Sequence, residues 1–259
     1  MADTKKTVLI TGSTRGIGLA LVEHYTKAGW NVIATARATS NTDKLMAFSP
    51  FKTVKLDTSD ESSVLEAARD LNGVPIDLLI NNAGVAQPTT FATATKESLM
   101  QHIEVNVTGP FLVTRALLPN LELAVKARGD AVVLQVSSVV GSISLNTEEN
   151  AHMVRGHYGY VVSKAALNMV TRSLVLDLRE RNIIVVAANP GFVDTEMNGH
   201  QGHIKPGDSA ASMAKIVSEA SLKDWQILRR GPHHVYDRIA VVSAGEAPHQ
   251  TPTSVTRHE

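Results

Sequence analysis

The feature that most restricts this chain is a glycine-rich stretch near its start, TGSTRGIG at residues 11–18. It follows the apolar run TVLIT and precedes a segment whose apolar residues recur at helical spacing. In a strand–turn–helix unit, Gly12 would permit a tight turn, Gly16 a close approach to a pyrophosphate, and Gly18 close packing of the helix on a sheet. The start of the helix would offer free N–H groups to the phosphates. We therefore interpret the stretch as a dinucleotide cradle; a purely structural turn is the alternative.

The remaining chain alternates short apolar runs with helical segments. Runs rich in valine and isoleucine, which we expect to be strands, lie at 7–11, 31–36, 53–57, 76–84, 131–138, 182–191 and 235–242. Their nearly continuous apolar character is typical of strands buried on both faces of a parallel sheet. Helical periodicity is expected at 17–28, 61–71, 96–127, 160–181 and 208–220. The alternation predicts an α/β fold of the doubly wound Rossmann type, with about seven mostly parallel strands and helices on both faces.

Domain limits follow from the same periodicity. No linker-like stretch divides the chain, so residues 1–243 are expected to form one dinucleotide-binding domain that also carries the active site. Residues 244–259 lose the apolar periodicity and are expected to form a mobile tail.

Composition excludes several classes of protein. Lys+Arg and Asp+Glu both number 25, which argues against a nucleic-acid or membrane-surface binder. The lack of cysteine excludes disulfides, thiolate catalysis and cysteine-ligated zinc. The first apolar stretch is too short for a signal peptide, and no run is long enough to span a membrane. Ten histidines form no metal motif such as HExxH. We expect a soluble cytoplasmic protein without a metal.

Two arginines indicate which dinucleotide would bind. A carboxylate at the end of the second strand would hold the adenosine ribose of NAD, but this strand ends in Ala36 and Arg37. A second cation, Arg15, lies inside the glycine loop. Because guanidinium groups present a planar fork of donors to phosphate oxygens, the pair favours the 2′-phosphate of NADP(H). The alternative for each arginine is a solvated surface position.

Several further motifs follow the glycine loop, and their order along the chain indicates a protein family more specifically than any one motif does. After TGSTRGIG come NNAG at 81–84, SS at 137–138 with a glycine three residues on, YVVSK at 160–164, and NPG at 189–191 followed by Thr195. With this set, which covers residues 7 to about 242, the chain resembles the short-chain dehydrogenase/reductase family, in particular its NADP(H)-dependent carbonyl reductases. The resemblance implies a Rossmann fold, a nicotinamide dinucleotide and a catalytic set of Asn106, Ser138, Tyr160 and Lys164.

The residue spacing agrees with the implied chemistry. Tyr160 and Lys164 share a helix face at i and i+4, so the ammonium can stabilise a phenolate that exchanges protons near neutral pH. Tyr158 has Val162 four residues on, and hence no such partner. Ser138 follows the fifth strand and would polarise a substrate carbonyl, with Ser137 as the other possibility.

Asn106 lies in an expected helix, four residues before Pro110. Because proline has no N–H, the main-chain carbonyl of Asn106 loses its usual helical partner and becomes available to water. In the family that the chain resembles, the matching asparagine holds a water through this carbonyl and completes a proton relay to the lysine and tyrosine.

The resemblance also implies contacts to the cofactor along the whole cleft. Asp57 matches the adenine contact, and Asn82, Ala83 and Gly84 match the stretch beneath the adenosine ribose. Pro190, Gly191, Val193 and Thr195 match the segment that holds the nicotinamide carboxamide. The complete set of expected cofactor residues is Gly12, Ser13, Thr14, Arg15, Gly16, Ile17, Gly18, Arg37, Asp57, Thr58, Asn82, Ala83, Gly84, Tyr160, Lys164, Pro190, Gly191, Val193 and Thr195.

The function expected from these residues is the NADPH-dependent reduction of an aldehyde, ketone or quinone carbonyl to an alcohol. A dinucleotide-binding redox sensor with little turnover is the alternative, although a sensor need not keep a proton donor. An epimerase or dehydratase of the family's extended branch would need a longer chain. Substrate choice is expected to depend on segments 139–159 and 192–208. The partner would be a small carbonyl or alcohol compound, and a homodimer or homotetramer is expected.

Overall fold

The computed structural model describes residues 5–221 and 242–243. Its centre is a seven-stranded parallel sheet of order β3-β2-β1-β4-β5-β6-β7. The strands are β1 (Thr7–Ile10), β2 (Asn31–Ala36), β3 (Lys52–Lys55), β4 (Leu78–Asn81), β5 (Ala131–Val136), β6 (Ile183–Asn189) and the two-residue β7 (Val242–Ser243). The expected doubly wound α/β fold is thus confirmed. Of the run expected at 235–242, residues 235–241 lie outside the described residues, as does the expected tail at 244–259.

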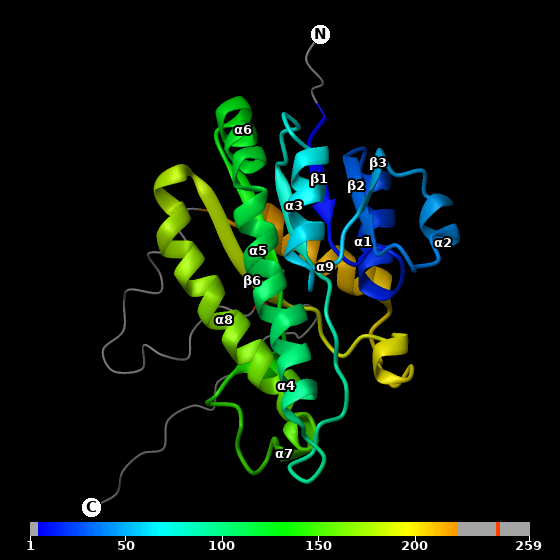
Figure 1. The fold of residues 1–259 in the computed structure, drawn as a ribbon, viewed down its shortest axis with the longest axis vertical. Coiled ribbons are helices and arrows are strands. Elements are labelled where there is room, and N and C mark those ends of the chain that lie inside the picture. Colours follow the sequence, from blue (N-terminus) through cyan, green and yellow to red (C-terminus); the bar gives the residue numbers. More distant parts are fainter. Residues whose placement is uncertain (1–4, 222–241, 244–259) are drawn as a thin grey trace, which may run out of the picture.

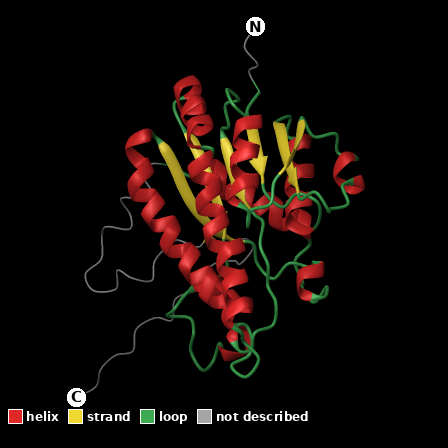
Figure 2. Cartoon of the chain, in the orientation of Figure 1, coloured by secondary structure: helices red, strands yellow, loops and turns green. Residues whose placement is uncertain are grey.

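Helices cover both faces of the sheet, as Figures 1 and 2 show. The α-helices are α1 (Gly16–Lys27), α2 (Asp43–Met46), α3 (Glu61–Asp70), α4 (Lys96–Ile103), α5 (Gly109–Ala116), α6 (Leu118–Arg128), α7 (Ala151–Val154), α8 (Tyr158–Leu178) and α9 (Pro206–Glu219). Shorter helical turns are η1 (Glu104–Thr108), η2 (Val139–Gly141), η3 (Arg179–Arg181) and η4 (Glu196–Asn198).

The core lies in two layers, one on each face of the sheet. Leu9, Leu79 and Val133 pack with residues of α3, α5, α6 and α8. The neighbouring strand positions, such as Ile10 and Ile80, pack with α1 and α9 on the other face. Because successive strand residues point to opposite faces, both faces need apolar side chains. This explains why the strands are continuous apolar runs rather than alternating ones.

The prediction of one continuous helix over 96–127 was wrong. It is divided into α4, the π-helical turn η1, α5 and α6. In η1 the N–H of Gly109 bonds the carbonyl of Glu104, five residues back, which changes the hydrogen-bond register just before Pro110. Pro119 then lies in the first turn of α6, a position that proline tolerates well. Most of the expected range is therefore helical, but the register change at η1 and Pro119 divide it into separate helices.

Two short helices were missed because they lie in segments that read as loops. They are α2 and α7, and α7 lies within the 139–159 segment. No helix in the described ranges is both long and apolar enough to cross a membrane. The carboxyl ends of the strands point toward the lower side of Figure 1, where α4 and α7 lie, and the candidate site is at this edge.

Candidate active site

The glycine loop between β1 and α1 has the geometry that its sequence predicted. Gly12 and Gly16 have φ of +68° and +54°, a region that residues with a Cβ seldom adopt. A Cβ on Gly18 would lie 2.0 Å from the carbonyl oxygen of Gly12. Only glycine at position 18 therefore lets the first turn of α1 close onto the loop.

Hydrogen bonds fix this loop to β2 and to the end of β4. The hydroxyl of Thr11 accepts from the N–H groups of Asn82 and Ala83 at 2.9 and 3.0 Å, and the Asn82 amide donates to the carbonyl of Thr11 at 2.9 Å. The fully buried Ser13 donates its hydroxyl to Ile10 and its N–H to Thr35. Both donors of Ser13 are thus used inside the protein.

The cradle fits the phosphates of a dinucleotide. No side chain caps the N-terminus of α1, whose first turn carries Gly16, Ile17 and Gly18. The N–H groups of such an uncapped turn are available to an anion. Glycine at position 12 also lets the loop pack on the segment after β4, because a Cβ there would lie 3.0 Å from the Cα atom of Ala83.

The two arginines expected to hold a 2′-phosphate differ in their present contacts. Arg37 follows β2 directly and is exposed, and among the described residues it has no ion-pair partner. The Nη1 atom of Arg15 lies 3.0 Å from Oε2 of Glu196. Sequence reasoning missed this contact, because the two residues are 181 positions apart.

Ser138, Tyr160 and Lys164 come together at the carboxyl edge of β5. Ser138 follows this strand, and the two other residues lie one turn apart on α8. The Ser138 hydroxyl forms a hydrogen bond with the Tyr160 phenol. The Lys164 Nζ atom is 5.5 Å from the centre of the Tyr160 ring and donates to the Val136 carbonyl at 2.8 Å. A hydroxyl, a phenol and an amine thus converge where ligands bind in open α/β sheets.

The geometry also separates Ser138 from Ser137. Ser137 is buried and donates its hydroxyl to Oδ1 of Asn168 at 2.6 Å. Ser138 is half-buried and faces Tyr160. A Cβ on Gly141 would lie 2.7 Å from the main-chain carbon of Lys164, so glycine is needed for the close packing of η2 on α8. Of the two serines, Ser138 is therefore the one whose hydroxyl lies at Tyr160.

Burial controls the proton affinities at this site. Removal from water raises the pKa of the Tyr160 phenol, and the hydrogen bond from Ser138 partly offsets the increase. Burial lowers the pKa of Lys164 to about 8. The sequence led us to expect stabilisation of the phenolate by the ammonium, but in the structure desolvation of the phenol is the larger effect. Tyr160 is therefore a neutral phenol that can donate a proton.

The side chain of Asn106 organises the wall beside this site. Asn106 is fully buried, accepts from the Val85 N–H at 2.8 Å, and donates to the Val85 carbonyl and the Ser163 hydroxyl, both at 2.9 Å. The backbone at Asn106 departs from a regular α-helix for two reasons: Pro110 has no N–H, and Asn106 lies in the π-helical turn η1. The expected role of its carbonyl stays a prediction.

His102, one turn before Asn106, was missed by the sequence reasoning. Its buried ring accepts from the Gln87 N–H through Nε2 at 3.1 Å, and its Nδ1 lies 2.7 Å from the Ser98 carbonyl. A Cβ on Gly159 would lie 2.5 Å from Nδ1. His102 thus holds the 85–87 segment against the start of α8, directly before Tyr160. The sequence around His102 reads as an ordinary amphipathic helix, so it did not indicate this role.

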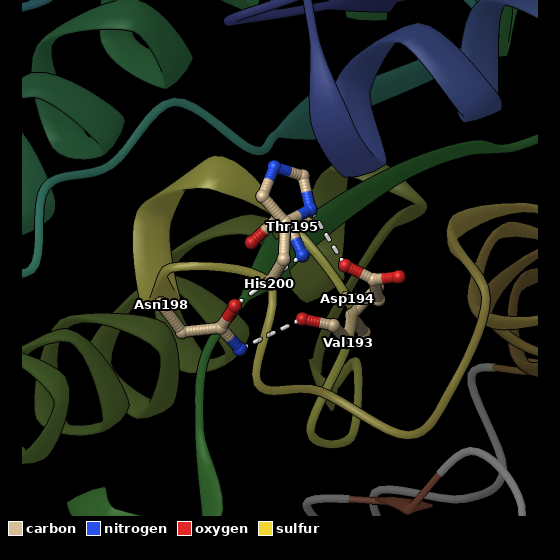
Figure 3. Close-up of polar contacts among 5 residues, drawn as sticks. All are labelled: Val193, Asp194, Thr195, Asn198 and His200. Carbon is tan, nitrogen blue, oxygen red and sulfur yellow. Dashed lines mark hydrogen bonds and ion pairs between the residues drawn. The ribbon is translucent and has the colours of Figure 1, made fainter.

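The segment after β6 forms a compact loop, which Figure 3 shows. The Asn198 side chain donates to the Val193 carbonyl at 2.8 Å and accepts from the Thr195 N–H at 3.3 Å. Nδ1 of His200 lies 2.7 Å from Oδ1 of Asp194. Before the loop, Gly191 has φ of +82° and the Pro190 carbonyl accepts from Ser209. The Thr195 methyl would be 3.4 Å from a Cβ on Gly16, so this loop borders the glycine cradle.

The other expected cofactor residues lie along the same edge. Asp57 is half-buried, and its carboxylate accepts from the N–H and the hydroxyl of Ser59. Thr58 is buried, and a Cβ on Gly109 would lie 2.7 Å from its carbonyl oxygen. Gly84 lies beside Asn106. Within residues 5–221 and 242–243, no group of three or more possible ligands for a metal ion occurs.

The fold and this site define a Rossmann-type protein with a serine, a tyrosine and a lysine at the edge of its sheet. Residues 6–205 match the model of the short chain dehydrogenase family, so the chain belongs to this family. Its members are oxidoreductases that act on alcohol or carbonyl groups and bind a nicotinamide dinucleotide.

Individual relatives agree with this assignment. The chain is 34% identical over 200 residues to a 3-oxoacyl-(acyl-carrier-protein) reductase of Aquifex aeolicus, an alignment that covers 74% of this chain and 75% of the relative. The structure resembles an NADPH-bound carbonyl reductase from chicken fatty liver, with a TM-score of 0.76, 32% identity, and coverage of 85% of this chain and 94% of that one. It also resembles a 3-ketoacyl-(acyl-carrier-protein) reductase from Brucella melitensis in complex with NADH, with a TM-score of 0.71, 27% identity, and coverage of 83% and 91%.

Proposed function

We propose that this protein is an NADPH-dependent reductase of an aldehyde, ketone or quinone, with Tyr160 as the general acid. The observation that carries the proposal is the convergence of Ser138, Tyr160 and Lys164 at the edge of β5. Reduction of a carbonyl builds negative charge on its oxygen, which must be held by donors and protonated. Ser138 and Tyr160 supply two neighbouring hydroxyl donors for that oxygen.

The two hydroxyl groups have different roles. The Ser138 hydroxyl is a poor acid, so it holds the carbonyl oxygen and orients it. Tyr160 carries its proton at neutral pH, as a donor in the reductive direction must, although burial makes the phenol a weaker acid. Lys164, with a pKa near 8, lies beside the ring and can supply positive charge and a proton to the phenolate left behind. The bound nicotinamide would supply the hydride.

We include Asn106 as the next group in the proton path. Pro110 cannot donate to its carbonyl, which leaves that carbonyl available to a water near Lys164. The side chain of Asn106 is already used for Val85 and Ser163, so the proposed role falls to its main-chain carbonyl.

The preference for NADP(H) rests on Arg15 and Arg37. Ala36 and Arg37 occupy the position where NAD-binding chains carry a carboxylate. Arg37 has no competing ion pair within the described part of the chain, so it can turn toward a 2′-phosphate. The similarity to an NADPH-bound carbonyl reductase supports this choice, whereas a relative of lower identity was solved with NADH. A cytoplasmic location, a homo-oligomeric state and the domain limits stay predictions.

The test is loss of NADPH absorbance with a panel of aldehydes, ketones, quinones and 3-oxoacyl thioesters. We expect turnover of at least one free carbonyl compound with NADPH. With NADH in place of NADPH, turnover of the same compound should be slower or absent. Tight NADPH binding without turnover of any compound would refute the proposal and support a redox-sensing role. Turnover of the thioesters alone would place the protein with the acyl-carrier-protein reductases.

A further inference from the structure

The ion pair between Arg15 and Glu196 joins two parts of the proposed cofactor site. Arg15 precedes α1 in the glycine loop, and Glu196 begins η4 in the loop after β6. Their Nη1 and Oε2 atoms are 3.0 Å apart, and both side chains are more than half exposed. Among the described residues, Glu196 is the acidic partner of Arg15. The same guanidinium that would hold a 2′-phosphate is therefore already paired with a carboxylate.

The loop that carries Glu196 is fixed by its own contacts. Asn198 bonds both Val193 and Thr195, and Asp194 pairs with His200, as Figure 3 shows. A Cβ on Gly202 would lie only 2.1 Å from the main-chain carbon of Val193, so the far side of the loop packs closely on its start. Because the backbone on both sides of Glu196 is held, the ion pair with Arg15 joins the glycine loop to a fixed segment.

A carboxylate beside Arg15 affects the two nicotinamide dinucleotides differently. NADP(H) brings a phosphate to the guanidinium, which must then exchange or share its partner, and two anions next to each other repel. NAD(H) lacks that phosphate and leaves the pair as it is. We propose that Glu196 is a specificity-determining residue, whose carboxylate competes with the 2′-phosphate for Arg15 and so weakens the binding of NADP(H) but not of NAD(H).

This inference rests on the proposed function, because it takes Arg15 as a ligand of the 2′-phosphate. The effect should be modest, since exposed ion pairs contribute at most about 1 kcal/mol, which corresponds to roughly fivefold in a dissociation constant. The chain itself would then keep its NADPH affinity below the value that Arg15 and Arg37 could reach together. Weaker binding also favours release of the cofactor after each turnover.

The experiment measures dissociation constants of NADPH and NADH by fluorescence titration at low ionic strength. The proteins are wild type, Glu196→Gln, Arg15→Gln and the double variant, with Glu23→Gln as a control. Glu23 pairs with Lys27 on α1, so this control removes a surface carboxylate that is not paired with Arg15. Glu196→Gln should bind NADPH about two to five times more tightly than wild type, with little change for NADH. In the Arg15→Gln background, the Glu196 substitution should have no effect, and Glu23→Gln should match wild type.

Several results would overturn the inference. Weaker binding of both cofactors to Glu196→Gln would mean that the ion pair stabilises the complex with either dinucleotide. Equal tightening of both cofactors, or an effect that persists without Arg15, would show that the carboxylate does not act through competition for this guanidinium. If Arg15→Gln weakens NADPH binding but Glu196→Gln changes nothing, only the role of Glu196 fails. If Arg15→Gln also changes nothing, the proposed assignment of Arg15 to the 2′-phosphate fails with it.

Discussion

Replacing Lys164 by methionine should make the protein more stable while removing its activity. Lys164 is buried, and its pKa falls from 10.5 to about 8. Since a tenfold change in proton affinity corresponds to 1.36 kcal/mol, the buried ammonium costs the folded state on the order of 3 kcal/mol at neutral pH. Methionine has a similar length and no charge. It leaves the Val136 carbonyl without its donor, at a cost of about 1 kcal/mol. The net expected gain is about 1–2 kcal/mol.

The dependence on pH distinguishes this cause from improved packing. Between pH 8 and 10.5 the unfolded lysine still binds its proton, whereas the folded one has lost it. Because the unfolded state binds more protons there, the stability of the wild type rises with pH. The advantage of Lys164→Met should therefore be complete below pH 8 and largely gone near pH 9.5.

Equilibrium unfolding in urea at about pH 7 and about pH 9.5 measures both quantities. Lys27→Met, at an exposed position, is the matched control and should shift the midpoint little at either pH. A Lys164→Met variant that is less stable than wild type at pH 7, or equally stabilised at both pH values, would refute the reasoning.

Three further predictions concern the cofactor, the proton path and the wall of the site. Arg37→Ala should weaken NADPH binding at least about tenfold and NADH binding little, as measured by titration; equal affinity of the wild type for both cofactors would contradict the assignment. Pro110→Ala restores an N–H for the Asn106 carbonyl and should reduce turnover with unchanged NADPH affinity; an unchanged rate would exclude that carbonyl from the relay. His102→Leu leaves the Gln87 N–H without an acceptor and should lower the free energy of unfolding by about 1–3 kcal/mol, whereas His102→Gln should lose less; equal losses would argue against the hydrogen bond.

The sequence predicted most of the fold because local patterns control it. Apolar runs buried on both faces mark the strands, and the steric need for glycine at positions 12, 16 and 18 is visible in the spacing itself. The continuous helix over 96–127 was wrong because the register change at η1 depends on how the chain packs there. Periodicity alone does not report a five-residue hydrogen-bond register.

The site was less predictable where contacts are distant in sequence. The structure separates Ser137 from Ser138 through Asn168, which is 31 residues from Ser137 and accepts a hydrogen bond from its hydroxyl. The pairing of Arg15 with Glu196 is likewise a product of tertiary structure. The direction of the Tyr160 pKa shift could not be obtained from spacing either, because it depends on how much water the fold removes from the phenol.

The rate of carbonyl reduction by Tyr160→Phe tests the central claim most directly. This substitution keeps the ring and removes only the phenolic hydroxyl, so the variant should fold and bind NADPH as wild type does. Loss of a general acid lowers a rate by roughly 10²–10⁴, and turnover on an accepted substrate should fall by at least that factor. Tyr158→Phe, at the exposed first residue of α8, is the matched control and should lose far less. Near-normal turnover of Tyr160→Phe, with the same substrate and cofactor, would contradict the active site described here.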